Sequence, residues 1–243
     1  MVSFRSSLAQ RVKNESCILR RALLLSFSLL IAIRCSTCIA ADVDALVASW
    51  LNAQTNVQTW SADLTQTRTL KSLVQPLTAT GHVTFVAPNR FRWELGQPAQ
   101  TIAVQNTNEM LVIYPPLKRA ERYPLTKKLP AQWRDMLALL NAGFPRNQTE
   151  MDEQFNILAE IVRNDVCEVI VEPRSASARK LMSQMRIAFG TNDFLLRSTE
   201  LQFADGSTMR NDFTNATVNA KVNETLFAPI LPDDYQITEP LKR

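Results

Sequence analysis

The sequence predicts one α+β domain, in which a long antiparallel sheet has about two helices available to cover one face. Two observations predict this fold class. Apolar residues recur at helical spacing in two segments, whereas elsewhere they alternate with polar residues at a period of two. After residue 40, no internal repeat and no linker rich in proline or glycine divides the chain. We therefore expect these elements to share one interior.

Residues 1–40 have the pattern of a secretory signal peptide. A basic segment ends at Arg21, and the apolar run that follows, 22–33, is shorter than the roughly 20 residues that span a bilayer. Small residues, Cys38 and Ala40, precede a possible cut after residue 40. We expect export, cleavage near Ala40 and a mature domain of residues 41–243. A retained membrane anchor and lipidation of a cysteine in this segment are the alternatives.

The net positive charge of the chain, and three of its four cysteines, come from this leader. Residues 1–40 hold six of the 27 basic and one of the 23 acidic residues, which leaves 21 basic and 22 acidic residues in the mature domain, a net charge of −1. Nucleic acid is therefore not an expected partner, because it requires a basic patch. Cys167 is the only cysteine after residue 40. It has no partner for an internal disulfide, and its apolar strand pattern predicts a small buried side chain.

The mature domain begins with a helical pattern and continues with strands. Val43, Leu46, Val47, Trp50 and Leu51 follow the spacing i, i+3, i+4, i+7 and i+8, which predicts an amphipathic helix of about three turns. From Trp60 the period changes to two, and short polar breaks separate the alternating runs, as in an antiparallel meander. The predicted strands lie within residues 60–70, 81–88, 90–95, 100–105 and 109–116.

A second helical pattern occupies residues 129–145. Trp133, Met136, Leu137 and Leu140 form its apolar stripe, Pro130 falls in its first turn, and Gly143 and Pro145 end it. Alternation then resumes, with Asp205-Gly206 as a hairpin turn, and residues 175–180 read as a helical turn or a loop. The later strands are predicted within 154–162, 166–173, 183–190, 194–204 and 208–219.

Candidate catalytic groups are scarce. His82 is the only histidine and lies out of phase with Val83 and Phe85, on the polar side of its strand. One histidine and one cysteine give no catalytic triad and no convincing metal site, and five glycines give no phosphate-binding loop. We therefore expect no enzyme and no cofactor. Tryptophan in both helical stripes and methionine in the second suit a surface that repacks around different contents.

Several short motifs follow one another along the mature domain. "WSADLTQ" (60–66) has the form aromatic-x-Ala-x-apolar-x-Gln, and "GHVTFVAPNRFRWEL" (81–95) combines a glycine, a strand, a proline and Phe-x-Trp. Pro98, Tyr114 and Pro116 follow in the next segment, and Phe227 and Pro232 in the last. In order and spacing these motifs resemble those of the LolA family, periplasmic carriers of outer-membrane lipoproteins. Leu64 stands where that family has phenylalanine, and Ala87 where it commonly has arginine.

The resemblance implies a strongly curved antiparallel sheet, an incomplete β-barrel, with helices covering its concave face as a lid. Acyl chains of lipoproteins would bind between sheet and lid, without a cofactor. The cargo would come from an inner-membrane ABC-type lipoprotein-releasing complex and pass to an outer-membrane lipoprotein acceptor, and we expect the carrier to be a monomer in the periplasm. The expected cavity lining is Leu46, Trp50, Phe85, Phe91, Trp93, Trp133, Met136, Leu137 and Leu140.

The charged face of the strand at 90–95 is expected to meet solvent through Arg92 and Glu94. Since the family arginine is replaced by Ala87, Arg90 or Arg92 would be the candidates to latch the lid. The alternatives to a lipoprotein carrier are a lipid- or lipoprotein-binding sensor, a carrier of another amphiphile such as a glycolipid, the lipid-anchored acceptor with the same fold, and an enzyme of unknown type.

Overall fold

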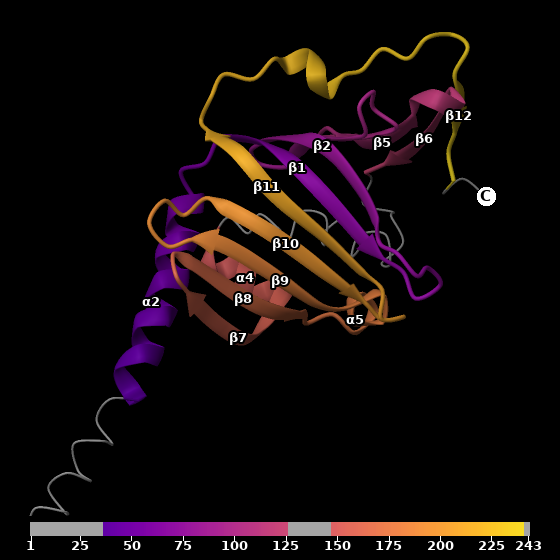
Figure 1. Cartoon of the computed structure of the whole chain (residues 1–243). Coiled ribbons are helices and arrows are strands. Elements are labelled where there is room, and N and C mark those ends of the chain that lie inside the picture. The colour runs from indigo at the N-terminus through magenta and orange to yellow at the C-terminus, as the bar shows by residue number, and fades with distance from the viewer. Residues whose placement is uncertain (1–35, 126–146, 241–243) are drawn as a thin grey trace, which may run out of the picture. The chain divides into compact units, whose positions relative to one another are not determined.

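The structure is a computed structural model that describes residues 36–125 and 147–240, with side chains from residue 44 onward (Figure 1). The chain divides into two compact units, Met1–Ala45 and Leu46–Arg243. Helix α2 (Ser36–Gln54) begins in the first unit, within the predicted leader, and all other described elements belong to the second. None of the helices in the described residues is long and apolar enough to cross a membrane.

The second unit is built on one sheet of twelve strands, in the order β12-β6-β5-β4-β3-β2-β1-β11-β10-β9-β8-β7. Neighbouring strands are antiparallel except β12 and β6, which are parallel. The pairing of β1 with β11 joins the two meanders that the sequence predicts. The strands are β1 (Thr59–Thr69), β2 (Leu77–Val86), β3 (Arg90–Leu95), β4 (Thr101–Gln105), β5 (Glu109–Tyr114), β6 (Arg119–Pro124), β7 (Phe155–Arg163), β8 (Val166–Pro173), β9 (Met182–Gly190), β10 (Leu196–Phe203), β11 (Thr208–Val218) and β12 (Gln236–Thr238).

The predicted strong curvature is not observed. The sheet is mostly antiparallel and open, and it is neither closed nor strongly curled. Closing a sheet requires a consistent tilt and stagger of all strands, whereas here β12 and β7 end the sheet without pairing with each other. The fold is therefore mostly β, an open twisted sheet with short helices, rather than an incomplete barrel.

The strand predictions are otherwise confirmed, and a few elements were missed. The turn at Asp205-Gly206 connects β10 and β11, with Gly206 at a φ of 81° that glycine adopts without strain. Residues 175–180 form most of α5 (Ala176–Leu181). Strands β6 and β12 and helix α4 (Gln148–Gln154) were not predicted, because each is short and has no clear apolar period.

One face of the sheet, here the aromatic face, collects the large side chains of the central strands. Trp60, Phe85 and Phe91 are direct neighbours across β1, β2 and β3. Phe213 of β11 contacts the rings of Trp60 and Trp93 edge-on, at centroid distances of 5.2 and 6.1 Å. Phe91 and Trp93 thus face aromatic neighbours, as the alternation of residues 90–95 predicts.

The end of helix α2 packs on the sheet through the predicted apolar stripe. Val47, Trp50 and Leu51 are each at most 2% exposed. The indole of Trp50 stacks on the ring of Phe189 in β9, with centroids 4.6 Å apart and planes within 4°. The contact fixes the last turns of α2 against the sheet. The predicted second helix at 129–145 lies outside the described residues.

Polar side chains form a buried ladder across β1, β11 and β10. The Gln66 amide donates to Asn211 Oδ1 at 2.9 Å, and the Asn211 amide donates to Thr199 Oγ1 at 3.1 Å. All three residues are less than 9% exposed. Because a buried polar group is costly unless it is paired, this ladder favours a single register for the long-range β1–β11 pairing.

The opposite face of β3–β6 is covered by residues 219–235, here the C-terminal segment. Phe227, at the end of the 3-10 helix η2 (Glu224–Phe227), packs on Val86 and Val104. Further along, Leu231 and Tyr235 pack on a cluster of three buried side chains of β5 and β6. The C-terminal segment therefore supplies the apolar cover of this face. That cluster is Leu111, Ile113 and Ala120.

This cover contradicts the expectation that Arg92 meets solvent, whereas the side chain of Glu94 is 33% exposed. The Arg92 side chain is only 16% exposed; it donates to Glu94 at 2.5 Å and to the carbonyl of Leu226 at 3.2 Å. Arg90 pairs with Glu224, and its guanidinium lies 5.1 Å from the ring centroid of Phe227. Both arginines therefore hold the C-terminal segment; the lid helix that they were expected to latch lies outside the described residues.

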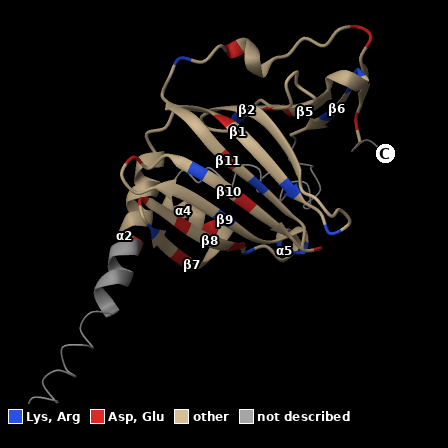
Figure 2. Cartoon of the chain, viewed as in Figure 1, with Lys and Arg blue, Asp and Glu red and all other residues tan. Residues whose placement is uncertain are grey.

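On β8–β11 the register places charged side chains on the same opposite face. Figure 2 shows basic and acidic residues interspersed along these strands. Arg186 lies between Glu168 and Glu200, at 3.2 and 3.8 Å. Arg210 pairs with Asp212 at 2.6 Å and with Glu200 at 3.6 Å. Each of these charges faces a partner of opposite sign across or along the strands.

Candidate functional site

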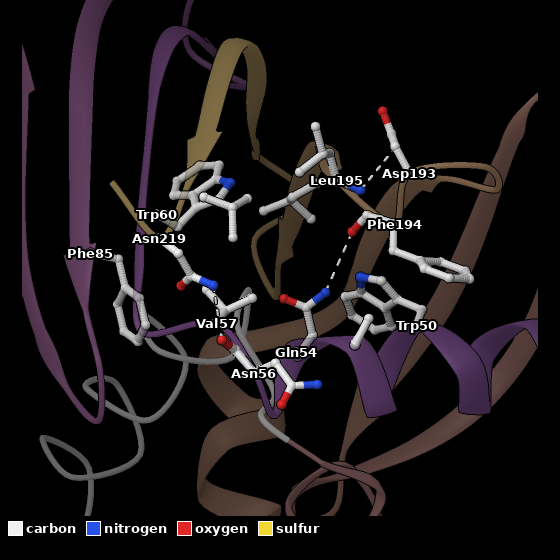
Figure 3. Close-up of a pocket in the computed structure, with 13 residues that line it drawn as sticks. Trp50, Gln54, Asn56, Val57, Trp60, Phe85, Asp193, Phe194, Leu195 and Asn219 are labelled. Atoms are coloured by element: carbon white, nitrogen blue, oxygen red, sulfur yellow. Dashed lines mark hydrogen bonds between the residues drawn. The ribbon is translucent and has the colours of Figure 1, made fainter. Parts of the chain in front are cut away.

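An apolar pocket of about 410 Å³ lies where the end of α2 meets the sheet (Figure 3). Its walls come from five places: the end of α2 with its connection to β1, the start of β1, the end of β2, the turn between β9 and β10, and the end of β11 with the residue that follows it. Its lining is Trp50, Ala53, Gln54, Asn56, Val57, Trp60, Phe85, Asp193, Phe194, Leu195, Leu196, Val218 and Asn219.

The α2–β1 connection is tied down by Asn219, the residue after β11. The Asn219 side chain accepts a hydrogen bond from the backbone amide of Gln58 at 2.7 Å and donates one to the backbone carbonyl of Asn56 at 3.1 Å. Asn219 has a φ of 57°, in the left-handed region that asparagine tolerates better than most residues. This tether places Val57 in the pocket wall between the helix and the sheet.

The opposite wall comes from the β9–β10 turn. Asp193 Oδ1 accepts from the Leu195 amide at 3.0 Å, and Oδ2 accepts from Arg197 at 2.5 Å. Burial opposes the ionisation of Asp193, but these hydrogen bonds outweigh it and lower the pKa of its carboxyl group. Phe194 has a φ of 54°, and its ring lies 6.5 Å from that of Phe189. The turn thus presents Phe194 and Leu195 to the cavity.

The predicted lining residues are only partly together. Trp50 and Phe85 line the pocket. Phe91 is buried beside Phe85 and Trp93 is half-buried, both on the aromatic face but outside the pocket lining. Leu46 is half-buried on α2 and is also not part of the lining. The other four predicted residues lie outside the described residues. They are Trp133, Met136, Leu137 and Leu140.

The remaining pocket residues were not predicted. Val57, Phe194 and Leu195 lie in connections, and Val218 and Leu196 lie at strand ends. Hydrophobic periodicity in the sequence identifies residues inside helices and strands, but it does not show which connecting loops meet in space. Phe194 and Leu195 were within a predicted strand, and their adjacent apolar side chains were the available signal.

The pocket suits an apolar ligand. A cavity of about 150 Å³ accommodates benzene, or roughly 25 Å³ for each carbon atom, so 410 Å³ corresponds to a chain of about 16 carbons. Its interior is tryptophan, phenylalanine, leucine and valine, and its polar groups are two asparagines, a glutamine and Asp193. Such a site can desolvate a hydrocarbon chain and hold one polar end.

Apart from Asp193, the titratable groups of the described residues lie outside the pocket lining. His82 Nδ1 is 3.0 Å from Asp63, and both side chains are about half exposed, on the polar side of β1 and β2 as predicted. Hydrogen bonds from Asn215 and His82 lower the pKa of Asp63. Within residues 36–125 and 147–240, no three histidine, cysteine, aspartate or glutamate side chains are grouped to hold a metal ion.

Fold and pocket together define a class: an open, largely antiparallel sheet that holds an apolar ligand pocket beside its N-terminal helix. The sequence model of the family described as outer membrane lipoprotein carrier protein LolA matches residues 55–229, most of the chain. The chain belongs to the LolA family. That description names a carrier and no catalytic activity. No curated protein matches the chain.

Several solved structures are similar to this chain at low sequence identity. An uncharacterized conserved protein from Thermus thermophilus is 10% identical, with a TM-score of 0.48, over 81% of this chain and 99% of that one. A LolA superfamily protein from Nitrosomonas europaea is 8% identical, with a TM-score of 0.39, over 74% and 96% of the two chains. The MucA/MucB complex of Pseudomonas aeruginosa is 14% identical, with a TM-score of 0.40, over 76% and 60%. None of these likenesses bears on function.

Proposed function

We propose that the mature domain, residues 41–243 after removal of the signal peptide at 1–40, is a periplasmic carrier that binds the acyl chains of lipoproteins. It takes its cargo from an inner-membrane ABC-type releasing complex and delivers it to an outer-membrane acceptor. The observation that carries the proposal is the apolar pocket of about 410 Å³ in a chain of the LolA family.

The energetics fit this task. Exposing hydrocarbon to water costs about 0.8 kcal/mol for each methylene, so one long acyl chain represents on the order of 12 kcal/mol of gross burial. A lipid-modified protein therefore needs an apolar container to cross an aqueous compartment. Transfer to the acceptor then requires only that the acceptor bind the chains more tightly than the carrier does.

The pocket has room for one acyl chain. For a cargo with more than one acyl chain, the binding site would extend beyond the pocket. Phe91 and Trp93 continue the aromatic face next to Phe85, and Leu46 continues the apolar stripe of α2. We include these residues, with the predicted stripe of Trp133, Met136, Leu137 and Leu140, as proposed contacts of further chains.

The experiment is a charge in the pocket wall. Leu195 lines the pocket and is half-buried, so Leu195→Asp is expected to fold and to lower the affinity for a triacylated lipopeptide by tenfold or more, because the carboxylate must be desolvated against the chain. Leu117→Asp is the matched control, since Leu117 is 67% exposed and outside the pocket lining.

Binding would be measured by displacement of a fluorescent fatty-acid analogue, with circular dichroism to confirm folding. Equal affinity in the two variants would refute the pocket as the acyl site. A wild-type protein that binds a glycolipid but not the lipopeptide would replace the lipoprotein cargo by another amphiphile.

A further inference from the structure

Trp50 carries a buried hydrogen-bond donor without an acceptor. Its indole Nε1 is buried and has no hydrogen-bond partner in the part of the chain that the structure describes. The residue is only 1% exposed and lines the pocket. Buried donors are almost always paired, so an orphan at the wall of a ligand cavity points to an acceptor supplied by the ligand.

The position of this donor is fixed by packing. Stacking on Phe189 with nearly parallel planes holds the indole in one orientation. Gln54 lies one turn further along the same face of α2, and its amide donates to the Phe194 carbonyl at 3.4 Å, a long and therefore weak bond. Figure 3 shows the indole nitrogen on the side of the ring turned toward Gln54. A small rotation of Gln54 would present two donors to one ligand atom.

The charge of the pocket lining determines which hydrogen-bond acceptor of a ligand can lie beside the Trp50 N–H. Among residues 36–125 and 147–240, the pocket is lined by one acidic side chain, Asp193, and by no lysine or arginine. Asp193 is held ionised by Arg197 and the Leu195 amide. A free fatty acid would place its carboxylate beside Asp193, and the nearby Arg197 is already paired with that residue. The carbonyl of an ester or amide, by contrast, is a neutral acceptor for an indole N–H.

We propose that the Trp50 N–H, with the Gln54 amide, binds the carbonyl oxygen of an acyl ester or acyl amide whose chain fills the pocket. Trp50 is then a specificity-determining residue that favours esterified or amidated acyl chains over plain hydrocarbon and over free fatty acids. This inference rests on the proposed acyl-binding function and adds the chemical group by which the chain is recognised.

The test uses three probes with chains of the same length: methyl palmitate, hexadecyl methyl ether and palmitate. The wild-type protein is expected to bind the ester about tenfold more tightly than the ether, the worth of one good hydrogen bond, and palmitate the least tightly at pH 8. Trp50→Phe keeps a ring against Phe189 but removes the N–H, so the ester-to-ether affinity ratio should fall well below the wild-type value, and any preference that remains would come from the Gln54 amide.

Trp60→Phe is the comparison, because it makes the same chemical change at another tryptophan of the pocket. It should weaken both probes by the same factor and leave the ratio intact. Gln54→Leu gives a second test if Trp50→Phe does not fold, and it should also reduce the ratio.

The outcomes separate the two proposals. If none of the probes and no triacylated lipopeptide binds the wild-type protein, the carrier function itself fails. If the probes bind but the wild-type protein shows no preference for the ester, or if the folded variants at Trp50 and Gln54 keep it, the acyl function stands and the carbonyl contact is refuted.

Discussion

The stacked pair of Trp50 and Phe189 tests whether the end of α2 is part of the rigid core. The two residues are 1% and 0% exposed. Replacing either by alanine removes a fully buried aromatic ring and leaves a cavity, which costs about 3–5 kcal/mol. The contact between the rings should appear as a coupling of about 0.5–1.5 kcal/mol, so that the double variant loses less than the sum of the single losses.

The assay is equilibrium unfolding in urea of the wild-type protein, Trp50→Ala, Phe189→Ala and the double variant. Each kcal/mol should also lower the melting temperature by about 2–4 °C in a domain of this size. Trp60 and Phe213 form a matched control pair of the same residue types, 5.2 Å apart and edge-on within the sheet. Their coupling is expected to be similar, because the sheet fixes both rings.

The reasoning would be refuted by a coupling indistinguishable from zero at Trp50 and Phe189 while the control pair remains coupled. The reasoning would also be refuted if Trp50→Ala lowered the free energy of unfolding by less than about 1 kcal/mol. In either case the end of α2 would not be held on the sheet in solution, and the pocket wall that it supplies would not be preformed.

Two further predictions concern buried polar atoms. Asn211→Leu leaves the amide of Gln66 and the hydroxyl of Thr199 without their partner, so unfolding in urea should show a loss of about 1–3 kcal/mol; a loss below about 0.5 kcal/mol would contradict it. Burial raises the pKa of the Cys167 thiol to about 11, so iodoacetamide at pH 8 should modify it only after unfolding. Between pH 9 and 11 the unfolded thiol is ionised and the folded one is not, so stability should fall as pH rises, and Cys167→Ala should flatten that part of the pH profile.

The parts of the fold that the sequence predicts are those with a strong local period. The alternation of residues 90–95 correctly places Phe91 and Trp93 on one face, and the helical stripe correctly buries Trp50. The surroundings of Arg92 were predicted wrongly because its partner, the Leu226 carbonyl, lies 134 residues away in a segment without regular period. Local alternation says which side chains share a face, but not what covers that face.

The pocket shows the same limit. Trp50 and Phe85 were predicted because they lie in periodic elements, whereas Val57 and Leu195 lie in connections. These connections meet only because β1 pairs with β11 across most of the chain, which no local pattern reveals. The strong curvature was expected from the resemblance to the LolA family and not from a local pattern, and it depends on the stagger summed over all twelve strands.

The cover on the opposite face helps explain why a ligand would enter beside α2. A sheet with apolar side chains on both faces needs a cover on each. Over β3–β6 the chain supplies that cover itself, since Phe227 is 3% exposed against Val86 and Val104 and is fastened through Arg90. On the aromatic face, by contrast, the described residues leave a cavity of about 410 Å³ between α2 and the strands. The C-terminal segment therefore occupies the apolar surface of the face that it covers, whereas the pocket beside α2 keeps room for a hydrocarbon chain.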